Sequence, residues 1–96
     1  MVNFSERLRM LRTNAGMTQA ELAQRLNVTK SVVSYYELQE RTPSPDVLIR
    51  LADIFRVTTD YLLGINNQKT LDVSDLSEED IGYLLMTIDM LKKKKQ

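Results

Sequence analysis

The chain has 96 residues, and its 13 Lys and Arg residues balance 13 Asp and Glu residues to a formal net charge of zero. It contains no cysteine and no histidine, which excludes disulfides and thiolate chemistry and removes the commonest metal ligand and general base. Because its start lacks a signal-peptide apolar region and no apolar run approaches membrane-spanning length, we expect a small cytoplasmic protein with no membrane partner.

The first predicted helix covers residues 5–15. Leu8 and Leu11 recur there at helical spacing, and Gly16 follows at the position after a helix end where a positive φ is favoured. Three arginines alternate around this helix, and we expect them mostly to face solvent: Arg7, Arg9 and Arg12.

Two short helices separated by a tight turn are predicted next. Thr18 and Glu21 have the spacing of a capping box, in which each residue satisfies a backbone amide of the other. Asn27 begins the turn, and Thr29 caps a third helix over residues 30–38. The side chains expected to face the core are Leu22, Ala23 and Leu26 in the second helix and Val32, Val33 and Tyr36 in the third.

A fourth helix is predicted to start at Ser44, with Pro45 in its first turn and an acidic residue next. A short fifth helix covers residues 59–63 and is stopped by Gly64. Residues 1–64 are therefore expected to form one compact all-α domain. The inward-facing residues of the fourth helix are Leu48, Leu51, Ala52 and Phe55.

The remaining chain is predicted to be a polar linker over residues 65–76 followed by an amphipathic helix over residues 77–96. Ser77 caps this helix, which opens with acidic residues and closes with lysines, as the helix macrodipole favours. The helix could pair with a second copy or fold back over the core. Its apolar seam, which we expect to form a dimer contact, consists of Ile81, Leu84, Leu85, Ile88 and Leu91.

Residues 17–64 read MTQAELAQRLNVTKSVVSYYELQERTPSPDVLIRLADIFRVTTDYLLG. This segment resembles the lambda-repressor/Cro family of helix-turn-helix regulators (the XRE group), whose pattern is approximately MTQxELAxxLxVxxxxVSxYExGxRxPsxxxLxxLAxxxxVxxDYLLG. The resemblance covers about residues 4–64. It implies a compact five-helix lambda-repressor-like DNA-binding domain, to which this chain adds its C-terminal amphipathic helix. It also implies a third helix that reads the major groove, and a homodimer on a two-fold double-stranded DNA operator.

The residues of the third helix predict one outward face that can contact DNA bases, which we call the reading face. With Val33 and Tyr36 turned inward, the outward side chains at the start of the third helix can bond base edges, and Glu37 is expected to tie this helix to its neighbours. The expected base-contacting residues are Lys30, Ser31, Ser34 and Tyr35. The resemblance places Gln19 against a phosphate, and the other residues expected to contact phosphates are Thr18, Thr29, Arg41, Thr42 and Ser44.

One position departs from the family pattern. Gln39 stands where the family usually has glycine, in the loop after the third helix. If this residue is left-handed, the backbone penalty is roughly 1 kcal/mol. Arg41, in the same loop, could pair with Glu37 or Glu40 instead of contacting a phosphate.

The sequence thus predicts a sequence-specific DNA-binding transcriptional regulator, a repressor that occupies a palindromic operator as a homodimer. The alternative, which the zero net charge favours, is an adaptor that uses the helix-turn-helix scaffold to bind another regulator. An enzyme is not expected, because the chain lacks clustered catalytic groups and a phosphate-binding glycine loop. We expect no metal, no cofactor and no small-molecule substrate, and we expect any inducing signal to act through a partner such as a protein antirepressor, through proteolysis or through expression level.

Overall fold

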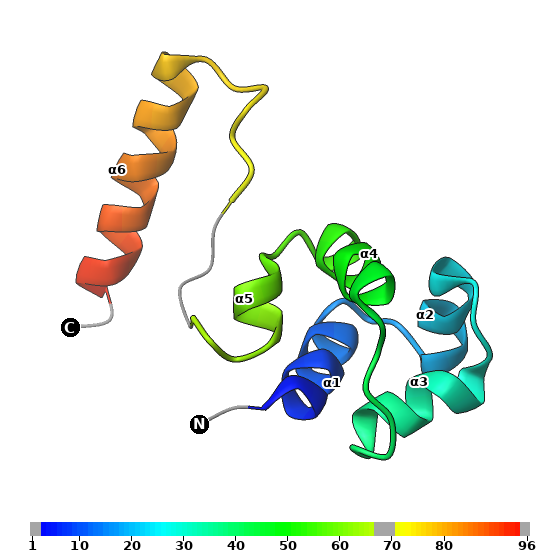
Figure 1. Ribbon diagram of the computed structural model, residues 1–96. Coiled ribbons are helices and arrows are strands. Elements are labelled where there is room, and N and C mark those ends of the chain that lie inside the picture. Colours follow the sequence, from blue (N-terminus) through cyan, green and yellow to red (C-terminus); the bar gives the residue numbers. More distant parts are fainter. Residues whose placement is uncertain (1–2, 67–70, 95–96) are drawn as a thin grey trace.

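The computed structural model describes residues 3–66 and 71–94, which contain helices and no strand (Figure 1). The expected all-α class is therefore confirmed for this part of the chain. The helices are α1 (Phe4–Asn14), α2 (Gln19–Leu26), α3 (Lys30–Glu37), α4 (Pro45–Phe55), α5 (Thr59–Leu62) and α6 (Glu78–Lys94). Each corresponds to a helix expected from the sequence, with bounds that shift by one or two residues.

The helix starts follow the local capping chemistry. Thr18, Thr29 and Ser44 each accept a hydrogen bond on the side-chain oxygen from the backbone N–H three residues later, as predicted. The capping box is complete, because the Glu21 carboxylate also accepts from the Thr18 backbone N–H at 3.1 Å. Thr58 caps α5 in the same way, and this cap was not among those predicted from the sequence.

The backbone adopts a left-handed conformation, with positive φ, at or just after the ends of the first five helices. Gly16 and Gly64 have φ of 71° and 79°, as their positions predicted. Asn27, Gln39 and Arg56 reach φ of 59°, 63° and 55° without being glycine. The family departure at residue 39 therefore changes the side chain while the backbone keeps its left-handed turn.

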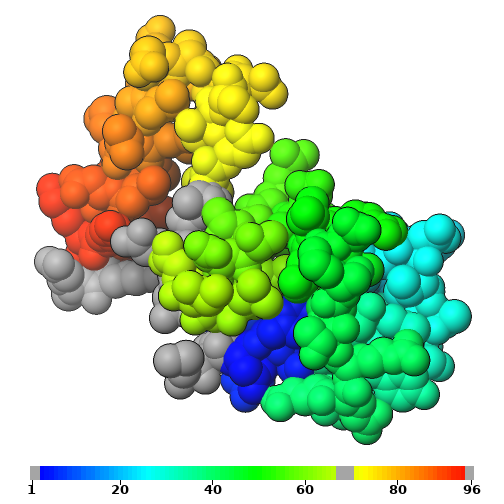
Figure 2. All heavy atoms as spheres, viewed as in Figure 1, coloured from blue at the N-terminus to red at the C-terminus, as the bar shows by residue number. Residues whose placement is uncertain are grey.

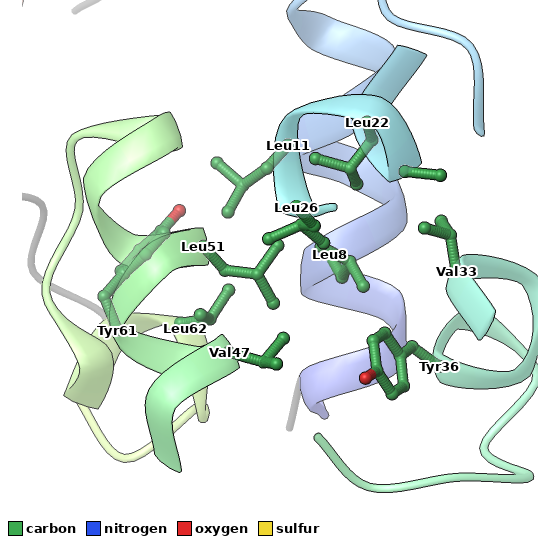
Figure 3. Packing of buried hydrophobic residues seen from close by; sticks show 11 residues of the cluster. Leu8, Leu11, Leu22, Leu26, Val33, Tyr36, Val47, Leu51, Tyr61 and Leu62 are labelled. Atoms are coloured by element: carbon green, nitrogen blue, oxygen red, sulfur yellow. The ribbon is translucent and has the colours of Figure 1, made fainter. Parts of the chain in front are cut away.

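The core lies between the first five helices (Figure 3). Val47 is buried although it was not among the expected core positions, whereas Leu48 and Phe55 are only partly buried. The start of α4 is thus rotated slightly from the face that the spacing indicated. The fully enclosed side chains, which no solvent reaches, are Leu8, Leu22, Leu26, Val33, Leu51 and Leu62.

The expectation that the arginines of α1 face solvent is wrong for two of them. Arg7 is 4% exposed, and its guanidinium carbon lies 3.9 Å from the centre of the Tyr61 ring. Its Nη1 donates to the Tyr61 carbonyl oxygen at 3.1 Å. Arg12 reaches toward Glu37, and the Arg9 side chain remains 66% exposed. Contact of α1 with both α3 and α5 covers these side chains, which helical spacing within α1 does not reveal.

The last helix stands apart from the core. Figures 1 and 2 show α6 on the side of the molecule opposite α2 and α3, and no described residue of α6 is buried. Ser77 caps the helix by accepting from the backbone N–H of Asp80 at 3.1 Å, as predicted. Within the described ranges, none of the helices is long and apolar enough to span a lipid bilayer.

Candidate nucleic-acid interface

The exposed face of α3 forms a shallow hollow with the first turn of α2. This hollow has a volume of about 310 Å³. Lys30, Ser31 and Tyr35 are exposed, whereas Ser34 and Gln19 are half-buried. The structure thus gathers the four expected base-contacting residues and the first expected phosphate contact on one surface: Gln19, Lys30, Ser31, Ser34 and Tyr35.

The opposite face of α3 is fixed to the core. Val33 is fully buried and Tyr36 is 5% exposed. The hydroxyl of Ser5 donates to the Tyr36 carbonyl oxygen at 2.6 Å, which joins the start of α1 to the end of α3. A helix of this length is marginal by itself, so these contacts hold its orientation.

A buried carboxylate ties three helices together behind the hollow. Arg12 donates to both oxygens of Glu37, from Nε to Oε2 at 2.6 Å and from Nη2 to Oε1 at 3.0 Å. The Glu37 side chain is 2% exposed, and its hydrogen bond raises the pKa of Arg12 above the usual value despite the opposing effect of desolvation. The expectation that Glu37 ties α3 to its neighbours is confirmed, and Arg12 is the partner that the sequence analysis missed.

Gln19 belongs to the same network. Its Nε2 donates to Oε1 of Glu37 at 3.1 Å, which holds the side chain beside α3. An amide nitrogen carries two hydrogens, so the second one can donate to a phosphate oxygen. Phosphate contact by Gln19 therefore stays a prediction, and its geometry is compatible with the bond to Glu37.

The hydroxyl groups expected at phosphates lie at helix starts. Thr18, Thr29 and Ser44 are exposed, and each accepts a capping hydrogen bond from its own helix. A hydroxyl that accepts can still donate its own proton, which is the contact that a phosphate oxygen needs. Thr42 is also exposed, in the loop between α3 and α4.

The loop after α3 brings Arg41 back toward the reading face. The backbone N–H groups of Glu40 and Arg41 donate to the Tyr35 carbonyl oxygen at 2.9 and 3.3 Å. The Arg41 guanidinium carbon lies 5.5 Å from the centre of the Tyr35 ring, within the range of a cation–π contact. The structure therefore shows neither of the two glutamate pairings considered for Arg41, and it places this cation beside an expected base-contacting residue.

The expected dimer residues lie elsewhere, on α6. Ile81 and Leu84 are half-buried beside the preceding segment, whereas Leu85, Ile88 and Leu91 are exposed. They do not cover α3, which lies on the opposite side of the molecule from α6 in Figure 1. Their role in dimerisation stays a prediction.

Comparison with known proteins finds helix-turn-helix proteins by sequence and by structure. A family model described as helix-turn-helix matches residues 8–62. The HTH-type transcriptional regulator ImmR of Bacillus subtilis (strain 168) is 36% identical over 87 residues, which cover 91% of this chain and 68% of ImmR. For three of the Bacillus subtilis relatives that it matches, the chain spans 57% to 68% of their length.

Two solved structures are similar as well. The P22 c2 repressor in complex with a synthetic operator has a TM-score of 0.65 and 27% identity, with coverage of 69% of this chain and 100% of that one. A transcriptional regulator from Listeria innocua has a TM-score of 0.64 and 29% identity, and the match covers 95% of this chain and 94% of the other. The second similarity therefore extends into the C-terminal part.

Proposed function

The chain belongs to the helix-turn-helix family, and from that premise we propose that it is a sequence-specific DNA-binding transcriptional regulator. One observation carries the proposal: the outward face of α3 is open while Val33 and Tyr36 hold its inner face in the core. A helix held in this way can enter the major groove without losing its orientation. The repressor–operator complex among its structural relatives supports double-stranded DNA as the partner.

Each side chain on the open face can take a chemical role in base reading. Lys30 can donate to O6 and N7 of guanine, and the serine hydroxyls can donate or accept at either kind of base pair. The Tyr35 ring can pack on a thymine methyl group, with Arg41 beside it to contact the backbone. Gln19 and the start of α2 offer amide donors to a phosphate. Local positive charge at these positions is sufficient, although the whole chain is neutral.

We propose further that the protein binds as a homodimer and represses by occupancy of a palindromic operator. One α3 can read only one half-site, and two copies are expected to read half-sites about one helical turn apart. The model divides the chain into a DNA-binding domain (1–64), a linker (65–76) and a dimerising helix (77–96), which would separate the reading face from the pairing face. Residues 67–70 of the linker and 95–96 of the helix lie outside the described residues. Relief of repression would then come from a protein antirepressor.

A second candidate function is an adaptor that binds another regulator through α6. The zero net charge and the unburied faces of α6 favour it. An adaptor would show no salt-dependent binding to genomic DNA fragments, whereas affinity of a regulator should fall steeply with added salt.

The decisive experiment is selection of bound sequences from a random DNA pool, followed by affinity measurements with variants. Lys30→Ala should relax sequence preference at one position by about 1–3 kcal/mol, whereas Gln19→Ala should weaken binding to all sequences alike. Lys93→Ala removes the same charge far from α3 and should leave the preference unchanged. An equal loss on selected and random DNA would contradict the role of Lys30, and a loss confined to selected DNA would contradict the role of Gln19. Failure to select any sequence would favour the adaptor.

A further inference from the structure

The terminal helix exposes apolar surface that the rest of the described chain does not cover. Leu85 is 62% exposed and Leu91 is 55% exposed, in a 17-residue helix without a buried side chain. The start of this helix and the segment before it form a groove of about 290 Å³. The residues that line the groove are Leu71, Val73, Ile81, Leu84, Leu85 and Ile88.

We propose that the occupant of this groove is α6 of a second copy, and that the two helices run antiparallel. This inference rests on the proposed homodimer and adds its orientation. If Ile81 of one copy lies opposite Leu91 of the other, the same register sets Leu84 opposite Ile88. The layers that these four residues form then each join two apolar side chains.

The register also fits the shape of the groove. In one copy, Leu71 and Val73 stand beside the start of α6, where Ile81 and Leu84 are half-buried. The other end of α6, with Leu91, lies outside the groove. In the antiparallel pair, the uncovered end of each helix fills the groove at the covered end of its partner.

The charges select the antiparallel orientation. The helical repeat of 3.6 residues places Glu78 and Asp80 on the two edges of the seam at its start, and Lys92 and Lys94 on the same two edges at its end. The antiparallel register brings Glu78 beside Lys92 and Asp80 beside Lys94, twice in the dimer. A parallel pair would instead set acidic ends together and lysines together, and it would align the two macrodipoles unfavourably.

Glu79 and Lys93 of α6 do not face the partner in this arrangement. Glu79 accepts a hydrogen bond from the Tyr83 hydroxyl at 3.3 Å, and Lys93 pairs with Asp89 at 3.1 Å. Both lie on the side of the helix away from the seam. Glu79 therefore provides a control that makes the same change in charge, one residue from Glu78.

The first test is self-association of the full chain by sedimentation at low salt. Glu78→Lys should raise the dimer dissociation constant roughly tenfold, since two attractive contacts become repulsive, whereas Glu79→Lys should leave it within about twofold. Adding Lys92→Glu to Glu78→Lys should restore pairing, even though this double change opposes the macrodipole at both ends. Equal weakening by Glu78→Lys and Glu79→Lys would overturn the proposal.

The second test measures orientation directly. The chain has no cysteine, so Glu79→Cys gives one site for a spin label on the side away from the seam. Antiparallel helices separate the two labels by about 20 Å along the helix axis in addition to their separation across the pair, whereas parallel helices leave only the separation across the pair. A dimer whose labels are separated only across the pair would refute the orientation and leave the proposed homodimer intact. A chain that stays monomeric both alone and on selected DNA would refute the homodimer itself.

Discussion

The core helix α4 and the terminal helix α6 have similar local sequence signals, but their leucines differ in solvent exposure. Leu51 of α4 is fully buried, whereas Leu85 of α6 is 62% exposed. Both helices have a serine cap, an acidic first turn and apolar residues at helical spacing. The difference shows that amphipathic pattern predicts a helix and a face, but burial requires a partner surface, which α6 lacks within the described chain.

The largest expected effect tests this contrast with the same substitution in both regions. Leu51→Ala removes a fully enclosed side chain and should lower the free energy of unfolding by about 2–5 kcal/mol. Leu85→Ala should change it by less than about 0.5 kcal/mol at low protein concentration. Urea unfolding of both variants checks this, and a large loss from Leu85→Ala in the monomer would mean that α6 does pack on the core.

A smaller effect is expected at the buried carboxylate that joins α1, α2 and α3. Glu37→Gln keeps the shape but removes the charge that Arg12 faces, so the free energy of unfolding should fall by about 2 kcal/mol. Glu40→Gln makes the same change at an exposed neighbour and should have little effect. Chemical denaturation again gives the comparison, and similar losses in the two variants would contradict a specific role for Glu37.

A gain in stability is expected from substitution of the left-handed residue after α3. Gln39→Gly should stabilise the core by about 1 kcal/mol, because glycine adopts φ of 63° without a side-chain penalty. Glu40→Gly, one residue later and without positive φ, should instead destabilise it. Thermal unfolding distinguishes the two. Destabilisation by Gln39→Gly would show that its side chain contributes more than its backbone costs.

The smallest effect concerns acid. Hydrogen bonds from Thr18 lower the pKa of Glu21 below its usual 4.5. The stability that the ionised Glu21 carboxylate contributes is fully present above pH 4.5, and it is lost as the pH falls through the lowered pKa. In the segment before α6, hydrogen bonds from Ser74 likewise lower the pKa of Asp72.

Only the first carboxylate caps a helix of the core. Glu21→Gln should therefore reduce the acid dependence of global unfolding, whereas Asp72→Asn should not. Unfolding curves at several acidic pH values measure the acid dependence of each variant. An equal change from both variants would mean that the segment before α6 unfolds together with the core.

The helix starts and ends of this chain were predictable because their chemistry is local. A capping residue such as Thr18 and its partner Glu21 lie three residues apart, and Gly16 needs only its own backbone. The same holds for the reading face, because the inward turn of Val33 fixes which neighbours point outward. Among the candidate site residues, those of α3 could therefore be grouped before the structure was known.

Contacts between distant segments were not predictable in the same way. Arg7 and Arg12 look like solvated residues within α1, and only packing against α5 and α3 gives them Tyr61 and Glu37 as partners. The placement of Arg41 over Tyr35 depends likewise on the path of the loop. Spacing within one helix carries no information about the polar groups of the next.

The sequence by itself determined the secondary structure of the described chain, the caps at Thr18, Thr29, Ser44 and Ser77, and the outward face of α3, since each depends on residues a few positions apart. The tertiary structure alone decided that a buried carboxylate locks α3 to α1 and α2, and that α6 stands away from the core with Leu85 and Leu91 exposed. The physical reason is that burial and ion pairing depend on which surfaces meet, and that is a property of the folded chain and of its assembly.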